Sequence, residues 1–131
     1  MVKQSLTPQM IDAGAELTRL LDKAYKVVAS LWLFLPDANS WRLVFAISEH
    51  DSLGPKKLYA KIHSILSAAM QPPIELELND VSVVPPNHPL IGLLRGAIGT
   101  GPGISGIRFS GNTINGQYVE DAYIYRIHFG T

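Results

Sequence analysis

Cysteine is absent from the 131-residue sequence, and this absence removes several kinds of chemistry at once. Without cysteine the chain cannot form disulfides, thiolate zinc centres or a cysteine nucleophile. The redox compartment is left undetermined, because a protein without disulfides suits reducing and oxidising surroundings alike. We therefore take a cytoplasmic location as the default expectation.

An excess of charge of either sign is also missing. Eleven lysine and arginine residues balance eleven aspartate and glutamate residues, so the formal net charge is zero. The charges are scattered along the sequence, whereas proteins that bind nucleic acid without sequence preference usually carry a concentrated basic surface. The charge balance therefore argues against nucleic acid as a partner.

Long hydrophobic runs are absent too. The apolar stretches are shorter than the roughly 18 to 20 residues that a membrane-spanning helix requires, and Met1–Ser5 leads into an amphipathic segment instead of the apolar centre of a secretory signal. No internal repeat or low-complexity tract divides the chain. We expect one soluble, unexported domain over residues 1–131, without a membrane partner.

The most apolar part of the sequence spans residues 27–48. It consists of two arms rich in β-branched and aromatic residues, separated by the polar stretch Pro36–Ser40. This pattern is typical of a β-hairpin. If the five residues Pro36–Ser40 form the loop, Leu35 lies opposite Trp41, and the alternation of side chains then divides each strand between two faces.

One of these two faces carries an apolar centre with little polar cover. In the predicted register it includes Trp32, Phe34 and Val44. Such a face is too apolar to lie open to water. A helix, the C-terminal segment or another subunit must therefore cover it. Of these we expect a second subunit in a two-fold homodimer, the simplest closed assembly, with Trp32, Phe34 and Val44 at the interface.

Three helices are predicted from apolar residues at helical spacing. The first begins at Thr7-Pro8, where threonine can cap the free amides and proline loses no hydrogen bond, and runs to about Lys23. The second spans about Pro55–Met70 and ends before Gln71-Pro72-Pro73. The third begins at Asn87-His88-Pro89 and ends at Gly99.

Three further strands are predicted after the first hairpin. The first of them covers residues 74–84: Ile74–Leu78 alternates strictly between apolar and acidic residues, and Val81–Val84 resumes the alternation in another phase, which suggests a bulge or a bend within one strand. Asn115-Gly116 is a strong signal for a type I′ turn between strands 107–114 and 117–127. The order α-β-β-α-β-α-β-β predicts an α+β domain, with a mixed or mainly antiparallel sheet of about five strands packed by three helices.

The terminal hairpin contains the most ligand-like set of residues. A two-residue turn places Arg108 opposite Tyr123, and so puts Arg108, Asp121, Tyr123 and Tyr125 on one face. A guanidinium, a carboxylate and two amphipathic rings are suited to binding a ligand or a partner protein. A purely structural ladder explains the same four residues equally well, and both interpretations stay open.

The glycine-rich stretch 99–106 leads directly into this hairpin. Glycine loops that bind phosphate run from a strand into the N-terminus of a helix, whereas this one runs from a helix into a strand and lacks the P-loop lysine. We interpret it as a flexible connector that is able to close over a bound ligand.

Metal and catalytic chemistry receive little support. Glu49, His50 and Asp51 form the densest group of possible metal ligands, but their position before Gly54-Pro55 suits the capping of a helix. Glu75 and Glu77 lie on the polar side of a predicted strand, which is an ordinary arrangement. We predict no metal site and no cofactor.

These observations favour a small ligand- or protein-binding module that self-associates. An enzyme is not the preferred interpretation, and no catalytic residue is assigned. The alternative is a metal-dependent nuclease or hydrolase, because the order of helix, hairpin and helix is similar to that of nuclease cores. That resemblance concerns only the order of elements, since the acidic residue followed two places later by lysine in a strand is missing, and fold analogy without site residues is weak.

Overall fold

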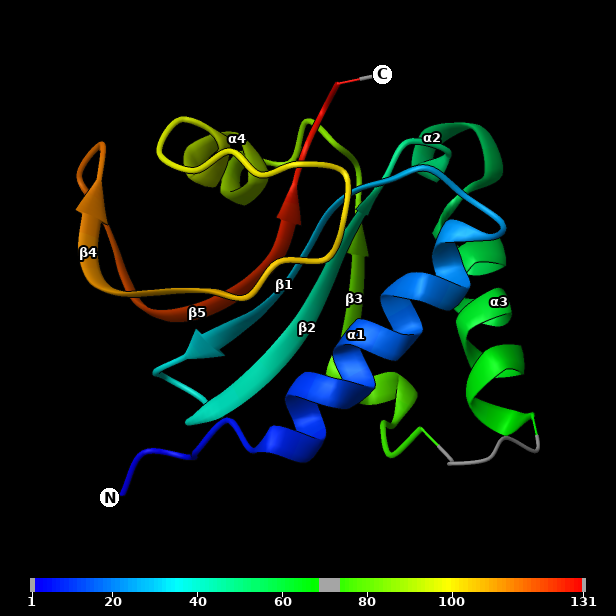
Figure 1. Cartoon of the computed structure of the whole chain (residues 1–131), viewed down its shortest axis with the longest axis horizontal. Helices are drawn as coiled ribbons and strands as arrows, with labels where there is room; N and C mark the ends of the chain where they lie inside the picture. Colours follow the sequence, from blue (N-terminus) through cyan, green and yellow to red (C-terminus); the bar gives the residue numbers. More distant parts are fainter. Residues whose placement is uncertain (1, 69–73, 131) are drawn as a thin grey trace.

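The computed structural model describes residues 2–68 and 74–130, in which four helices pack on one mixed five-stranded sheet (Figure 1). The strand order is β3-β2-β1-β5-β4, and all neighbours are antiparallel except β2 and β3. The predicted α+β class and five-stranded mixed sheet are confirmed. The elements are α1 (Pro8–Asp22), β1 (Val27–Leu35), β2 (Ser40–Ile47), α2 (His50–Leu53), α3 (Pro55–Ser67), the 3₁₀ turn η1 (Leu78–Asp80), β3 (Val81–Val84), α4 (Pro89–Arg95), β4 (Ile107–Ile114) and β5 (Gln117–Ile127).

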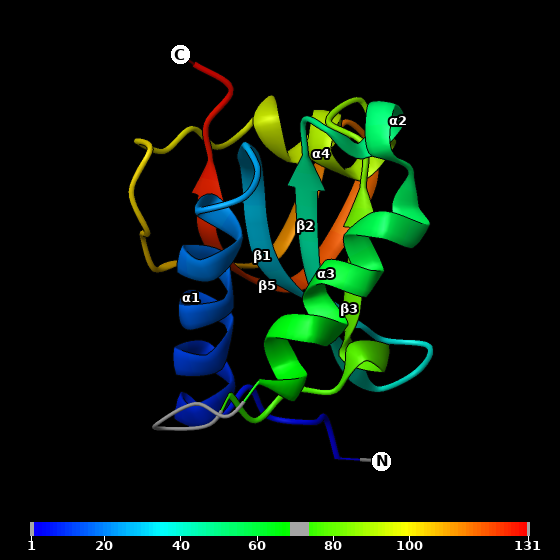
Figure 2. The same cartoon turned by 90° about the vertical axis from the view of Figure 1, so that its right-hand side faces the viewer.

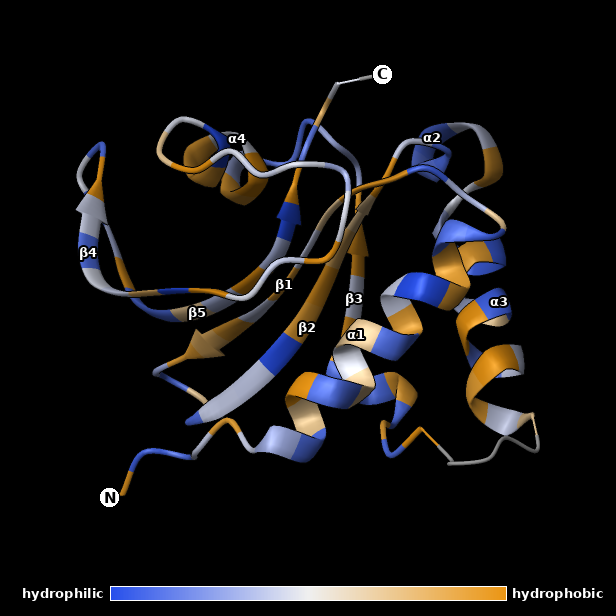
Figure 3. Cartoon of the chain, in the orientation of Figure 1, coloured by the Kyte–Doolittle hydropathy of each residue, from blue (hydrophilic) through white to orange (hydrophobic). Residues whose placement is uncertain are grey.

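Helices cover both faces of the sheet. Helices α1 and α3 lie on one face and α4 lies on the other (Figures 1 and 2). The cluster beneath α1 and α3 includes Leu17, Leu21, Trp32, Phe34, Trp41, Leu43, Phe45, Leu58, Ile62 and Tyr125. The cluster beneath α4 includes Leu31, Val44, Ala46, Ile91, Leu94, Val119, Ala122 and Ile124. Hydropathy agrees with this arrangement, because β1 and much of β2 are orange, whereas α1 and α3 alternate between orange and blue residues (Figure 3).

Helix α1 begins and ends as its sequence predicts. The Thr7 hydroxyl accepts a hydrogen bond from the Met10 amide at 3.2 Å, and proline occupies the first helical position. Lys23 follows the last helical residue as the C-cap. Both boundaries are local properties of the chain, which explains why they were predictable.

Helix α1 approaches the sheet most closely at Gly14. A Cβ atom at this position would lie 2.8 Å from the indole nitrogen of Trp32, and closer still to the hydroxyl of Tyr125. One turn later, the buried Thr18 hydroxyl lies 2.7 Å from the Gly14 carbonyl and 2.7 Å from the Ser30 hydroxyl. The contact between α1 and the sheet therefore contains a glycine, Gly14, and two buried hydroxyls, Thr18 and Ser30, that are hydrogen-bonded to each other.

The register of the first hairpin differs from the prediction by one residue. Phe34, not Leu35, lies opposite Trp41, and the loop has four residues because Leu35 pairs with Ser40. Asn39 closes this loop with φ of 47°, in the left-handed region that asparagine tolerates better than most residues. A shift of one residue moves side chains to the opposite face of a strand. The two predicted faces were therefore assigned wrongly.

The middle of the chain also departs from the predictions. A short helix α2 precedes α3, and Gly54 joins them with φ of 86°. Helix α3 begins at Pro55 as predicted but ends at Ser67, and Gln71-Pro72-Pro73 lies outside the described residues. Helix α4 is shorter than predicted and is capped by His88, whose imidazole accepts from the Leu90 amide at 3.1 Å.

The predicted strand is wrong over Ile74–Leu78. Residues 74–77 have no regular structure, and η1 follows. Leu76 and Leu78 still pack against the cluster beneath α1 and α3. The alternation of apolar and acidic residues therefore reflects which side chains are buried, although the segment pairs with no strand. The Glu77 amide donates to the Asp80 carboxylate at 3.1 Å. Side-chain bonding to the local backbone competes here with the sheet.

The terminal hairpin has the predicted turn and register. Asn115 and Gly116 both have positive φ, at 50° and 80°, as a type I′ turn requires. Arg108 pairs with Tyr123 and Ser110 with Asp121. Gly111 has φ of 63°, and the far end of the hairpin curls out of the plane of the sheet (Figure 1).

The glycine-rich segment 99–106 precedes β4 in the chain and runs beside the end of β5. The Thr100 amide donates to the Ile127 carbonyl at 2.9 Å, and the Ser105 amide donates to the Tyr125 carbonyl at 2.7 Å. Gly106 lies against the ring of Tyr123, where a Cβ atom would be 3.2 Å from the ring carbon that carries the hydroxyl. Both ends of the segment are thus tied to the last strand.

Candidate functional site

Asp121 is the centre of a charged cluster on the face that carries α1. Its carboxylate accepts two hydrogen bonds from Arg108, both at 2.6 Å, and one from Lys3 at 2.7 Å. Asp121 is only 3% exposed. The Arg108 hydrogen bond, aided by Lys3, lowers the pKa of Asp121 to about 2 against the opposing effect of burial, and the same bond raises the pKa of Arg108. This arrangement is a fork-like ion pair with a third partner.

The two cations of this cluster also lie over aromatic rings. The Lys3 ammonium is 4.7 Å from the centroid of Phe34, and the Arg108 guanidinium is 5.5 Å from that of Trp41. The indole of Trp41 donates to the Gln4 carbonyl at 2.9 Å. The segment before α1 thus closes over the end of the first hairpin and contributes to the burial of Asp121.

The two tyrosines of the terminal hairpin lie in different surroundings. Tyr125 is 1% exposed; its hydroxyl donates to the Ile11 carbonyl at 2.6 Å and accepts from the Trp32 indole at 3.0 Å. Burial raises the pKa of Tyr125. Tyr123 is half-buried, with its ring centroid 5.4 Å from that of Tyr125. The four predicted residues share one face, but Asp121 and Tyr125 are engaged inside the chain and only Arg108 and Tyr123 reach the surface.

The predicted dimer interface is wrong at its three residues. Trp32, Phe34 and Val44 are 1%, 4% and 4% exposed in the single chain. Trp32 and Phe34 lie in the cluster beneath α1 and α3, and Val44 lies on the opposite face beneath α4. Helices cover both faces of the sheet, so the chain itself supplies the cover that the sequence had suggested for a partner. The shift in the register of the first hairpin explains only why Val44 lies on the face opposite Trp32 and Phe34.

The acidic residues near α2 have structural partners. The Glu49 carboxylate accepts from the Lys26 amide at 3.0 and 3.2 Å, and His50 lies 3.0 Å from Asp51. Within residues 2–68 and 74–130, no three or more histidine and acidic side chains are grouped as metal binding requires. The alternative of a metal-dependent nuclease or hydrolase therefore gains no site from this geometry.

The outer edge of β4 is the first surface with binding potential. β4 is the last strand of the sheet and spans eight residues. It contains no proline, and its single charged residue, Arg108, is bonded to Asp121. Tyr118, which pairs with Thr113 across the hairpin, is 64% exposed, and its hydroxyl lies near Gly111. An aromatic ring therefore lies close to an unprotected strand edge.

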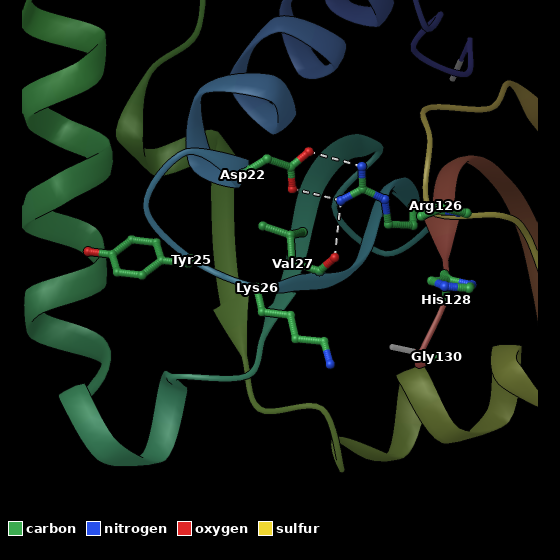
Figure 4. A pocket seen from close by; sticks show the side chains of 8 residues that line it. Asp22, Tyr25, Lys26, Val27, Arg126, His128 and Gly130 are labelled. Carbon is green, nitrogen blue, oxygen red and sulfur yellow. Dashed lines mark hydrogen bonds and ion pairs between the residues drawn. The ribbon is translucent and has the colours of Figure 1, made fainter.

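A cleft between the start of β1 and the end of β5 is the second such surface (Figure 4). Its volume is about 280 Å³. Sequence analysis missed it, although an arginine inside the apolar run of β5 was a usable signal, because a buried guanidinium requires an acidic partner. The lining residues are Asp22, Tyr25, Lys26, Val27, Pro102, Arg126, His128 and Gly130.

Arg126 forms the wall of this cleft and is 6% exposed. Its guanidinium donates to the two Asp22 carboxylate oxygens at 2.8 and 3.0 Å, to the Val27 carbonyl at 3.1 Å and to the Gly103 carbonyl at 3.3 Å. Four hydrogen bonds thus join the end of α1, the start of β1, the glycine-rich segment and β5. The buried charge is paired as such a group requires.

None of the helices in the described part of the chain has the length and apolar composition needed to cross a bilayer. The comparisons assign no family, because no protein-family model matches the sequence and no significant similarity was found to curated proteins or to solved structures.

Proposed function

We propose that this chain is a protein-binding module that self-associates by adding strands to the open edge of β4. The observation that carries the proposal is the eight-residue edge with the exposed Tyr118 beside it. An unpaired strand edge is a template for another strand, and proteins that stay monomeric usually protect it with proline, lysine or a covering element. The only charge of β4 is instead neutralised within its own hairpin.

The turn geometry identifies which backbone groups are available. Ile114 and Gln117 flank the two-residue turn and exchange the hydrogen bonds that close it, so the neighbouring Thr113 directs its amide and carbonyl away from β5. Thr113 is exposed. The outward groups of β4 can therefore accept a new strand without any change within the hairpin.

A second copy of the chain suits this edge. Antiparallel pairing about a two-fold axis lets β4 meet itself, which gives a closed dimer with one continuous sheet. Ile107, Phe109 and Ile114 are partly buried against the cluster beneath α4, and the partner's copies of these side chains would extend that apolar face. With no unneutralised charge on the strand, the two copies would not repel each other strongly.

The test uses Thr113→Pro, with Thr113→Ala as the matched control. Proline removes an outward amide and blocks strand addition, whereas alanine removes the same side chain and keeps the amide. We expect the unchanged chain and Thr113→Ala to dimerise in sedimentation velocity over the micromolar to submillimolar range, and Thr113→Pro to stay monomeric. Circular dichroism and thermal unfolding check that each variant is folded.

Two outcomes would contradict the proposal. One is an unchanged chain that remains monomeric over the whole concentration range. The other is a dimer that survives in a folded Thr113→Pro variant, because its interface would then lie elsewhere on the molecule.

A further inference from the structure

We infer that the cleft between β1 and the end of β5 is a binding site for a small organic carboxylate. The inference concerns a different surface from the open edge of β4 and does not depend on it. Four ionisable residues line the cleft, and the inference rests on their different roles: two are paired with each other and two are able to contact a ligand. These residues are Asp22, Lys26, Arg126 and His128.

Arg126 and Asp22 serve as the framework of the cleft. The Arg126 guanidinium already uses four hydrogen bonds within the chain, and its charge is balanced by Asp22. The same guanidinium lies near the C-terminal end of α1, where a cation offsets the partial negative charge of the helix end. The pair therefore lines the cleft with little net charge of its own.

Lys26 provides the attracting charge. It is exposed, and it takes part in none of the ion pairs found among the described residues. Its backbone is anchored by the Glu49 carboxylate, which accepts from the Lys26 amide. Figure 4 shows the Lys26 side chain extending towards the C-terminal segment that carries His128 and Gly130. A mobile cation on a fixed backbone suits the capture of an anion.

His128 provides a second polar contact whose tautomer is determined by its neighbour. Its Nδ1 atom lies 3.0 Å from the Thr100 carbonyl. A carbonyl can only accept, so Nδ1 carries a proton and Nε2 remains for a ligand. The neutral ring accepts a hydrogen bond at Nε2, for example from a ligand hydroxyl, and the protonated ring donates one to a carboxylate.

Charge and size together define the ligand. With neutral His128, two cations and one anion leave the lining with a charge of +1. A volume of about 280 Å³ is at the lower limit for small-molecule sites, and Val27 and Pro102 add apolar wall. The Tyr25 hydroxyl points away towards α3 (Figure 4), so it donates no hydrogen bond into the cleft. A short hydroxycarboxylate such as lactate fits these requirements.

The experiment titrates lactate, acetate and inorganic phosphate into the folded chain, with lactamide as the uncharged counterpart of lactate. Amide chemical shifts in ¹H–¹⁵N spectra report the site and the dissociation constant. We expect lactate and acetate to shift the amides of Lys26, Val27 and His128 and lactamide to leave them unchanged. Phosphate binding with equal affinity would show that the site selects anions in general, and would overturn the carboxylate assignment.

The matched variants are Lys26→Gln and Lys23→Gln, which remove the same charge from neighbouring exposed positions, only one of which lines the cleft. We expect Lys26→Gln to weaken lactate binding about tenfold or more, as the loss of a charge-assisted hydrogen bond does, and Lys23→Gln to leave it nearly unchanged. Equal affinity in both variants, equal binding of lactamide, or no carboxylate binding at millimolar concentration would each overturn the inference. The oligomeric state of Thr113→Pro is measured separately and does not affect this result.

Discussion

Replacing Gly14 by alanine tests the packing of α1 on the sheet. A methyl group at this position would lie 2.8 Å from the Trp32 indole nitrogen and closer to the Tyr125 hydroxyl. Both rings are fully buried, so neither can turn away into solvent. The helix must move outward or the rings must leave their present positions.

The expected change in the free energy of unfolding is the sum of one stabilising and two destabilising contributions. Alanine favours a helix interior over glycine by about 0.5–1 kcal/mol. Overpacking of a dense core costs about 1–3 kcal/mol, and loss of the Tyr125 hydrogen bond to the Ile11 carbonyl costs about 1–3 kcal/mol where the hydroxyl stays buried. The net expectation for Gly14→Ala is a loss of about 2–4 kcal/mol, or roughly 10 °C in the melting temperature of a chain of this size.

Gly92 offers a matched control within α4. A Cβ atom there meets no other atom within 4 Å, so only the helix-propensity term remains and Gly92→Ala should gain about 0.5–1 kcal/mol. Urea unfolding followed by circular dichroism measures both variants. A Gly14→Ala variant as stable as the unchanged chain would refute the close approach of α1 to Trp32 and Tyr125.

Two further predictions concern buried polar groups. Because the ion pairs with Arg108 and Lys3 depress the folded-state pKa of Asp121 to about 2, below its ordinary value of about 3.9, the stabilisation is present above pH 4 and is lost as the pH falls from 4 towards 2. Asp121→Asn should therefore cost about 1–2 kcal/mol at pH 6, allowing for the exposure of both cations, and much less at pH 2.5; a pH-independent cost in urea unfolding would refute the assignment. Thr18→Val leaves the buried Ser30 hydroxyl without its partner and should cost about 1–3 kcal/mol, and adding Ser30→Ala should restore part of that loss. Additive effects of these two changes in a double-mutant cycle would show that the hydroxyls are not coupled.

The best sequence predictions concern structure that depends on neighbouring residues alone. Thr7 and Pro8 set the start of α1 through capping and a fixed φ angle, and Asn115-Gly116 sets the register of the last hairpin because few other residue pairs tolerate positive φ at both positions. In each case the cause and the structure lie within a few residues of one another. The prediction that Arg108 and Asp121 share a face followed directly from that register.

The first hairpin was predicted, but its register was wrong by one residue because its loop depends on a distant segment. Asn39 accepts a hydrogen bond from the Gln4 amide and donates one to the Val2 carbonyl. Asparagine tolerates positive φ, but nothing within the loop showed that this residue would close a four-residue turn. The resulting register places Val44 on the face opposite Trp32 and Phe34, and helices on both faces bury all three side chains.

The cleft, finally, is a product of tertiary structure. Asp22 and Arg126 are separated by 104 positions. Pro102 joins them because segment 99–106 runs beside β5, and Lys26 joins them because the start of β1 pairs with the end of β5. Composition and periodicity indicate that an arginine in an apolar strand needs an acidic partner, but not which of the eleven acidic residues it is. Only the packing of α1 against the sheet brings the end of that helix to the guanidinium, because long-range pairing depends on the sum of all core contacts and not on any local pattern.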